Sequence, residues 1–131
     1  MNEENSQSQK IAEKLGKIAN DEVFQQLLKR SSLTRKQAET LIFDVMTQRD
    51  GVILTSQQRA ALRKVSKGAY FRTRQQALRN ISKSLFTLIL LTYLGLLKLP
   101  GYDWFFRLSQ AFEDGDWEAV NSFLASLEVE K

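Results

Sequence analysis

The chain contains neither cysteine nor histidine. Without thiols it cannot form disulfides, and without thiols and imidazoles it cannot build the usual zinc sites. The same two absences remove Ser-His-Asp and Cys-His nucleophile systems. The sequence also has no glycine-rich phosphate loop and no EF-hand spacing. We therefore expect a protein that is not an enzyme and uses no metal or cofactor, in a reducing, cytoplasmic compartment.

Residues that break regular structure are scarce as well. The 131 residues include one proline and six glycines, a composition that favours long helices over many short strands. Hydrophobic residues make up 43% and charged residues 26%, the balance of an ordinary globular domain. We predict an all-α fold, a small bundle of about six helices. A disordered tail over residues 1–8 is expected to precede a single helical domain over residues 9–131.

Long hydrophobic runs are absent too. The most apolar stretch, Leu85–Leu97, is shorter than the roughly 20 residues that a membrane-spanning helix needs. The polar, acidic start of the chain does not resemble a secretory signal. We therefore predict no membrane span and interpret Leu85–Leu97 as part of a long, largely buried apolar helix. The same segment could form a homodimer interface, or, with the basic residues before it, lie on a membrane surface.

Acidic residues are missing from one long stretch, because no Asp or Glu occurs between Gly51 and Tyr102. That stretch carries nine basic residues: Arg59, Arg63, Lys64, Lys67, Arg72, Arg74, Arg79, Lys83 and Lys98. A solvated helix face normally mixes charges, since opposite charges one turn apart stabilise a helix. A basic block without acids favours a polyanionic partner such as nucleic acid. Alternatively, it pairs with the acidic C-terminal segment of the same protein.

Local signals predict where several helices begin and end. Thr34 with Gln37, and Thr55 with Gln58, fit capping boxes, in which each side chain satisfies a backbone N–H group near the other. The other predicted boundaries are a C-cap at Gly51, N-caps at Ser66 and Asp116, and an end of the long helical element at residues 99–101. From Ala69 nothing stops a helix before Gly95, although a break near residues 82–84 is left open.

Residues 55–83 fit a helix-turn-helix. Such a motif needs a small residue inside its first helix, an apolar residue in the turn and a cap that opens its second helix. Ala60, Val65 and Ser66 supply these parts. The residues predicted to face the core from the second helix are Tyr70, Ala77, Ile81 and Leu85.

The outward face of that second helix is the candidate DNA site. Arginine can read guanine, glutamine can read adenine, and lysines mostly contact phosphates. The residues predicted to contact bases are Lys67, Phe71, Arg72, Gln75 and Gln76. The residues predicted to contact phosphates are Arg59, Arg63, Lys64, Arg74, Arg79 and Lys83.

A family resemblance points the same way. The segment Leu33–Leu41 (LTRKQAETL) resembles the opening helix of the domains found in region four of bacterial sigma factors and in response-regulator output domains. Val65–Arg72 resembles their turn and the start of their recognition helix. Just before the turn valine, where these domains usually carry a leucine and a glycine, this chain has Arg63 and Lys64. The resemblance covers residues 33–83 and implies a duplex-DNA-binding component of transcription, nucleoid-associated within the cell.

Two other classes of protein would use the same features. An RNA- or ribosome-associated protein would use the basic block without reading bases in a groove. A protein-interaction adaptor would use the basic face and the apolar helix to bind an acidic partner. Competition between duplex DNA and structured RNA for binding to the protein, with binding of neither as the third outcome, would distinguish these classes.

Overall fold

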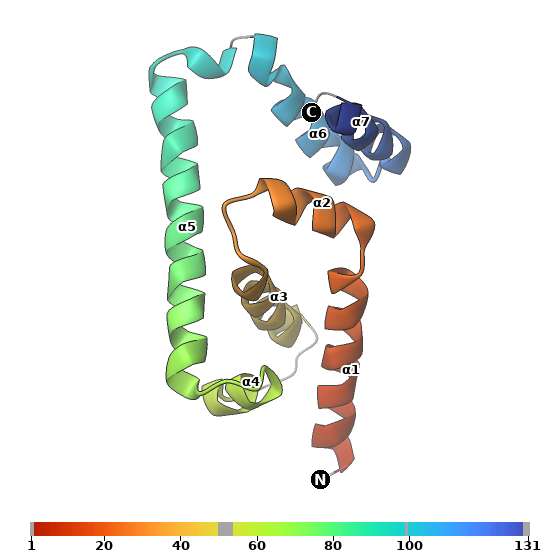
Figure 1. The fold of residues 1–131 in the computed structure, drawn as a ribbon, viewed down its shortest axis with the longest axis vertical. Helices are drawn as coiled ribbons and strands as arrows, with labels where there is room; N and C mark the ends of the chain where they lie inside the picture. The colour runs from red at the N-terminus through yellow and green to blue at the C-terminus, as the bar shows by residue number, and fades with distance from the viewer. Residues whose placement is uncertain (1, 50–53, 99, 130–131) are drawn as a thin grey trace. The chain divides into compact units, whose positions relative to one another are not determined.

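The computed structural model describes residues 2–49, 54–98 and 100–129, and within these ranges the chain is helical without any strand (Figure 1). The α-helices are α1 (Asn2–Ala19), α2 (Glu22–Arg30), α3 (Arg35–Arg49), α4 (Ser56–Leu62), α5 (Lys67–Tyr93), α6 (Asp103–Asp114) and α7 (Trp117–Val129). Two short 3₁₀ helices, η1 (Leu96–Lys98) and η2 (Pro100–Tyr102), precede α6. The predicted all-α class is confirmed. The C-cap predicted at Gly51 lies outside the described residues.

The domain organisation differs from the prediction in two respects. The chain forms two compact units, one ending at Ser82 and one beginning at Lys83, rather than a single domain. Helix α5 contributes residues to both units. The tail that was predicted to be disordered continues α1 back to Asn2. Its polar composition suggested disorder, but no proline or glycine precedes Gly16 to stop the helix.

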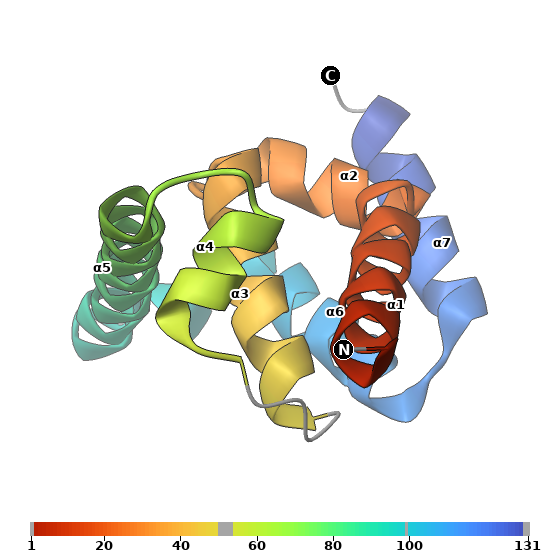
Figure 2. The same cartoon turned by 90° about the horizontal axis from the view of Figure 1, so that it is seen from below.

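The core of the first unit lies between α1 and α3. Ile11 and Leu15 of α1 pack with Phe43 and Met46 of α3, and Leu54 completes the cluster. Figure 2 shows α3 between α1 and α4. Helix α3 therefore lies at the centre of the first unit, next to α4 (Figure 2).

The predicted caps form as expected. In the first box, the Thr34 N–H donates to Oε1 of Gln37 at 3.1 Å and the Gln37 N–H donates to Oγ1 of Thr34 at 3.2 Å. The second box repeats the pattern between Thr55 and Gln58, at 2.8 and 3.1 Å. Asp116 also acts as predicted, because its Oδ1 accepts from the Ala119 N–H at 3.2 Å. These contacts span three residues, so local sequence is enough to predict them.

The second unit is built around the antiparallel turn from α6 to α7. Gly115 ends α6 in the left-handed conformation, with φ 67°, which favours glycine. Leu108, Val120 and Leu124 are buried, and the ring of Trp104 stacks on that of Phe123 at a centroid distance of 5.6 Å. The apolar interior of this unit is therefore small.

The prediction of a largely buried apolar helix over Leu85–Leu97 is wrong. Helix α5 is continuous to Tyr93, without a break at residues 82–84, but Leu85, Phe86, Ile89 and Leu90 are between 55% and 69% exposed. Leu85 therefore does not face the core as predicted. An apolar composition shows that burying the helix would be favourable. It does not show whether another part of the protein is present to cover it. In the described part of the chain, no helix is long and apolar enough to span a membrane.

Candidate nucleic-acid interface

The connection between α4 and α5 is a tight helix end. The Val65 N–H donates to the Ala60 carbonyl and the Lys64 N–H donates to the Ala61 carbonyl, both at 3.0 Å. These two bonds define a Schellman motif, which requires a left-handed residue just after the helix. Lys64 takes that conformation, with φ 57°. The turn thus forms with lysine at the place where glycine is usual.

Helix α5 begins directly after this turn. The Oγ of Ser66 accepts from the Ala69 N–H at 3.1 Å, which confirms the predicted N-cap. On the inner face of α5, Tyr70 and Ala77 are buried as predicted, at 4% and 0% exposure, and Ile81 is half-buried. The sequence therefore predicted correctly which side of the first half of α5 faces the core and which side faces outward.

A buried carboxylate fixes this motif to α3. Asp44 accepts from the Tyr70 hydroxyl at 2.6 Å, from Nη1 of Arg59 at 3.2 Å and from Nε of Arg74 at 2.5 Å. We call these four residues the Asp44 cluster. Burial, and then the hydrogen bond to Asp44, raises the pKa of Tyr70 above its ordinary value. One acidic side chain on α3 thereby contacts both α4 and α5, the two helices of the motif, and holds them against α3.

A second carboxylate on α3 binds another arginine of the basic block. Glu39 pairs with Arg63 and, across one helical turn, with Arg35 at 3.2 Å. Three of the six residues predicted to contact phosphates, Arg59, Arg63 and Arg74, therefore have carboxylate partners within the first unit. The acidic partners of these three arginines therefore lie on α3 rather than in the acidic C-terminal segment.

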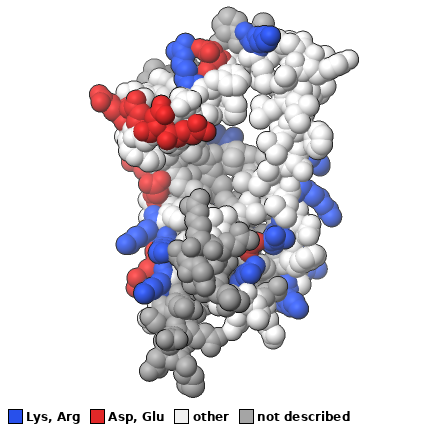
Figure 3. Space-filling view, turned by 180° about the vertical axis from the view of Figure 1, so that it is seen from behind, with Lys and Arg blue, Asp and Glu red and all other residues white. Residues whose placement is uncertain are grey.

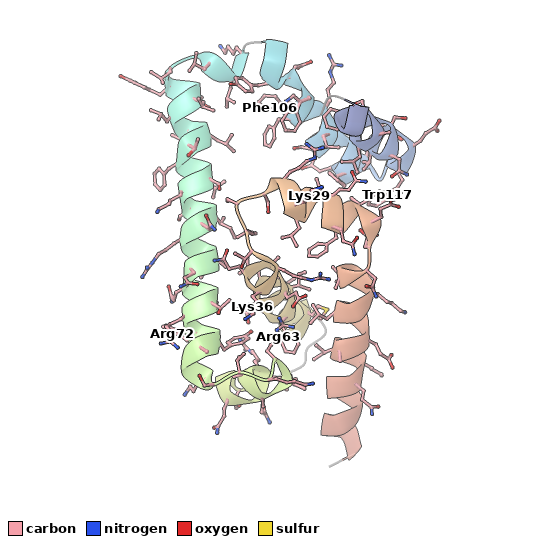
Figure 4. The ribbon with its side chains drawn as sticks, viewed as in Figure 1. Lys29, Lys36, Arg63, Arg72, Phe106 and Trp117 are labelled. Atoms are coloured by element: carbon pink, nitrogen blue, oxygen red, sulfur yellow. The ribbon has the colours of Figure 1, made fainter. Side chains whose placement is uncertain are left out.

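The residues predicted to contact bases lie on the outward side of α5. Lys67, Arg72 and Gln76 are exposed, Phe71 is 57% exposed and Gln75 is half-buried. Figure 4 shows Arg72 projecting away from α3 and α4. Five cations of the predicted site remain exposed: Lys64, Lys67, Arg72, Arg79 and Lys83. In Figure 3 blue side chains follow the first part of α5, at the right of that view.

A shallow pocket lies at the start of α5. It has a volume of about 390 Å³, and its lining includes Arg59, Lys67, Phe71 and Arg74. Cationic groups around an aromatic ring suit contact with a phosphate and the sugar next to it. The backbone of α5 adds its positive N-terminal end, which also favours an anion.

Sequence reasoning missed one cation beside the turn. Lys36, near the start of α3, is exposed and lines a small cavity of about 60 Å³ together with Val65 and Tyr70. It was overlooked because it lies in a stretch of mixed charge, outside the block without acids. Only its position next to the turn in three dimensions relates it to the motif.

The described residues do not gather three acidic side chains into a group that could bind a metal ion. What the described residues do form is a row of exposed cations and amides on α5, whose opposite face is held against α3 by the Asp44 cluster. No protein-family model matches the chain, and no curated protein or solved structure matches it either.

Proposed function

We propose that this protein binds duplex DNA through α4, the turn and the first half of α5, and acts in transcription. The observation that carries the proposal is the Schellman turn at Lys64, which leads into a helix whose outward side is cationic. Helix-turn-helix proteins place the second helix in the major groove and the first across the backbone. The resemblance of residues 33–83 to sigma-factor region four adds support.

The exposed residues divide by chemistry into base readers and phosphate contacts. Arg72 is suited to guanine, and Gln76 to adenine, because each can form two hydrogen bonds to one base edge. Phe71 offers an apolar surface for a thymine methyl group. Lys64, Arg79 and Lys83 are suited to phosphates, which set position rather than sequence. Lys67, which the sequence predicts as a base contact, is also better suited to a phosphate, because lysine acts as a point charge.

The arginines that pair with α3 serve a different purpose in this proposal. Arg59, Arg63 and Arg74 already have carboxylate partners, so they position the motif and add little to counterion release. Each neutralised phosphate changes the slope of log K against log salt by about −0.9. Because Arg72 is assigned to a base, the four exposed phosphate contacts predict a slope of about −3.6, whereas all eight basic residues between Arg59 and Lys83 would give about −7.

Fluorescence anisotropy of a labelled random-sequence duplex, titrated across a salt series, tests this proposal. We expect binding at low salt with a slope of about −3.5 to −4. The triple variant Lys67→Ala, Arg72→Ala, Arg79→Ala should abolish most of the binding to duplex DNA. A matched control removes three exposed lysines from α1 and α2 (Lys10→Ala, Lys17→Ala, Lys29→Ala), which changes net charge equally but leaves the motif intact.

Three results would count against the proposal. Absence of binding at low salt would remove the DNA interpretation. Equal loss of binding in both triple variants would mean that net charge acts without the motif. If a structured RNA hairpin displaces the duplex at equimolar concentration, the RNA-associated alternative replaces the DNA proposal.

A further inference from the structure

The C-terminal part of α5 carries an apolar surface in the second unit. Five large side chains there are exposed: Leu85 55%, Phe86 69%, Ile89 59%, Leu90 55% and Tyr93 85%. Leu85, Ile89 and Tyr93 repeat every four residues, and Phe86 and Leu90 form the neighbouring row. Residues four apart lie on one side of a helix, so the two rows make one continuous face. We call these five residues the apolar face.

The area of the apolar face is large for a free surface. A fully exposed large side chain offers roughly 150–200 Å², so the apolar face presents on the order of 500–600 Å². Patches of this size on single chains commonly mark interaction sites. A stable interface buries about 800 Å² on each partner. A neighbouring pocket of about 530 Å³, whose lining includes Thr92, Leu97 and Phe106, extends the contact surface toward that value.

Charge distinguishes between possible occupants. No charged residue occurs from Ser84 to Leu97, and the surface over this part of α5 is white in Figure 3. A twofold dimer brings a patch against its own copy, so any charge on it would meet a like charge. A neutral apolar face avoids this repulsion and is complementary to itself. The five residues of the apolar face offer no group that an acidic or basic partner could pair with, and the charged residues Lys98 and Asp103 line only the neighbouring pocket.

We propose that a second copy of this chain covers the apolar face and forms a twofold-symmetric dimer. The dimer does not depend on nucleic acid. If the proposed function is correct, the second copy also supplies a second Lys67–Lys83 segment, as proteins that bind paired half-sites require. The partner is therefore identified by the chemistry of the face, independently of DNA binding.

Sedimentation equilibrium of the full chain without nucleic acid tests the proposal. From about 1 to 200 µM, a range set by typical weak-dimer affinities, we expect the mass to rise from 15.1 kDa toward twice that value. Ile89→Glu should raise the dimer dissociation constant by at least about 100-fold, because it buries an unpaired carboxylate. Tyr93→Glu, at a more exposed position, should act in the same direction. Val45→Glu is the matched control, since Val45 is 44% exposed on α3.

Several outcomes overturn the proposal. One is a mass of 15.1 kDa at every concentration. Another is a dimer that survives both Ile89→Glu and Tyr93→Glu while circular dichroism shows unchanged helicity. Binding of a monomer to phosphatidylserine vesicles, lost in Ile89→Glu, would also overturn it and assign the face to a membrane. Anisotropy with duplex DNA, run separately, shows whether the proposed function stands or fails without the dimer.

Discussion

The hydroxyl of Tyr70 donates a 2.6 Å hydrogen bond to Oδ1 of Asp44, which lies 26 residues earlier on α3. The same carboxylate binds Arg59 of α4 and Arg74 of α5. A buried carboxylate is strongly disfavoured unless hydrogen bonds and a counter-charge compensate it. The Asp44 cluster provides both, and in doing so it sets the position of α4 and α5 on the first unit.

Tyr70→Phe should lower the free energy of unfolding by about 1–2 kcal/mol. The substitution removes one donor to a charged acceptor, a bond worth somewhat more than a neutral one, while the two arginines remain in place. Urea denaturation followed by circular dichroism measures the change. Tyr102→Phe is the control, because Tyr102 is 43% exposed, lies outside the apolar face and should show no loss. A Tyr70→Phe variant as stable as the parent would contradict the importance of this bond.

The stability difference between the parent and Tyr70→Phe should shrink at high pH. Because the pKa of Tyr70 is raised in the folded state, the unfolded chain loses its tyrosine proton first as pH rises above about 10. The stabilising contribution is therefore present below that pH and is lost above it, by up to about 1.4 kcal/mol per pH unit. Urea midpoints of both proteins at about pH 8 and pH 11 measure this. Lysine titration affects both proteins equally, so a constant difference would refute the assignment.

Arg72 and Arg74 lie two residues apart on α5 and should respond oppositely to substitution by glutamine. Arg74→Gln removes an ion pair with Asp44, so stability should fall by about 1–2 kcal/mol, reduced from the fully buried case because Arg74 is partly exposed. Arg72→Gln should change stability by less than about 0.5 kcal/mol. On a selected DNA site, Arg72→Gln should instead cost about 1–3 kcal/mol of binding.

Urea denaturation and DNA-binding anisotropy of Arg72→Gln and Arg74→Gln distinguish a DNA-contacting residue from one that stabilises the fold. Lys83→Ala serves as a phosphate-contact control, which should weaken all sequences alike and reduce the salt slope by about one. If Arg72→Gln and Lys83→Ala lose the same fraction of affinity on every sequence, α5 does not read bases.

Lys64→Gly should raise the free energy of unfolding while it weakens DNA binding. Lysine at φ 57° is less favourable than glycine, which occupies the left-handed region without strain. The added freedom of glycine in the unfolded chain offsets part of this gain. We expect a net stabilisation of about 0.5–1 kcal/mol together with a smaller salt slope for DNA binding. Lys64→Val, a β-branched residue at the same position, should destabilise the protein and thus confirm the backbone conformation.

Features that depend on neighbouring residues could be predicted from the amino-acid sequence alone. The two capping boxes, the Ser66 and Asp116 caps and the inward direction of Tyr70 and Ala77 follow from contacts within one or two helical turns. Such contacts can be recognised from spacing alone. The all-α class followed for the same reason, from few breakers and consistent helical periodicity.

Which charges are paired, and which apolar residues are covered, could be learned only from the folded chain. Asp44 and Glu39 meet arginines between 15 and 30 residues away, and no periodicity in the sequence relates those positions. Lys64 adopts a conformation that its residue type disfavours, because the hydrogen bonds of the turn impose it. Five apolar residues of α5 that resemble core in the sequence are exposed: Leu85, Phe86, Ile89, Leu90 and Tyr93. Burial depends on whether another surface is present to cover a helix, and that is a property of the assembled chain rather than of any one segment.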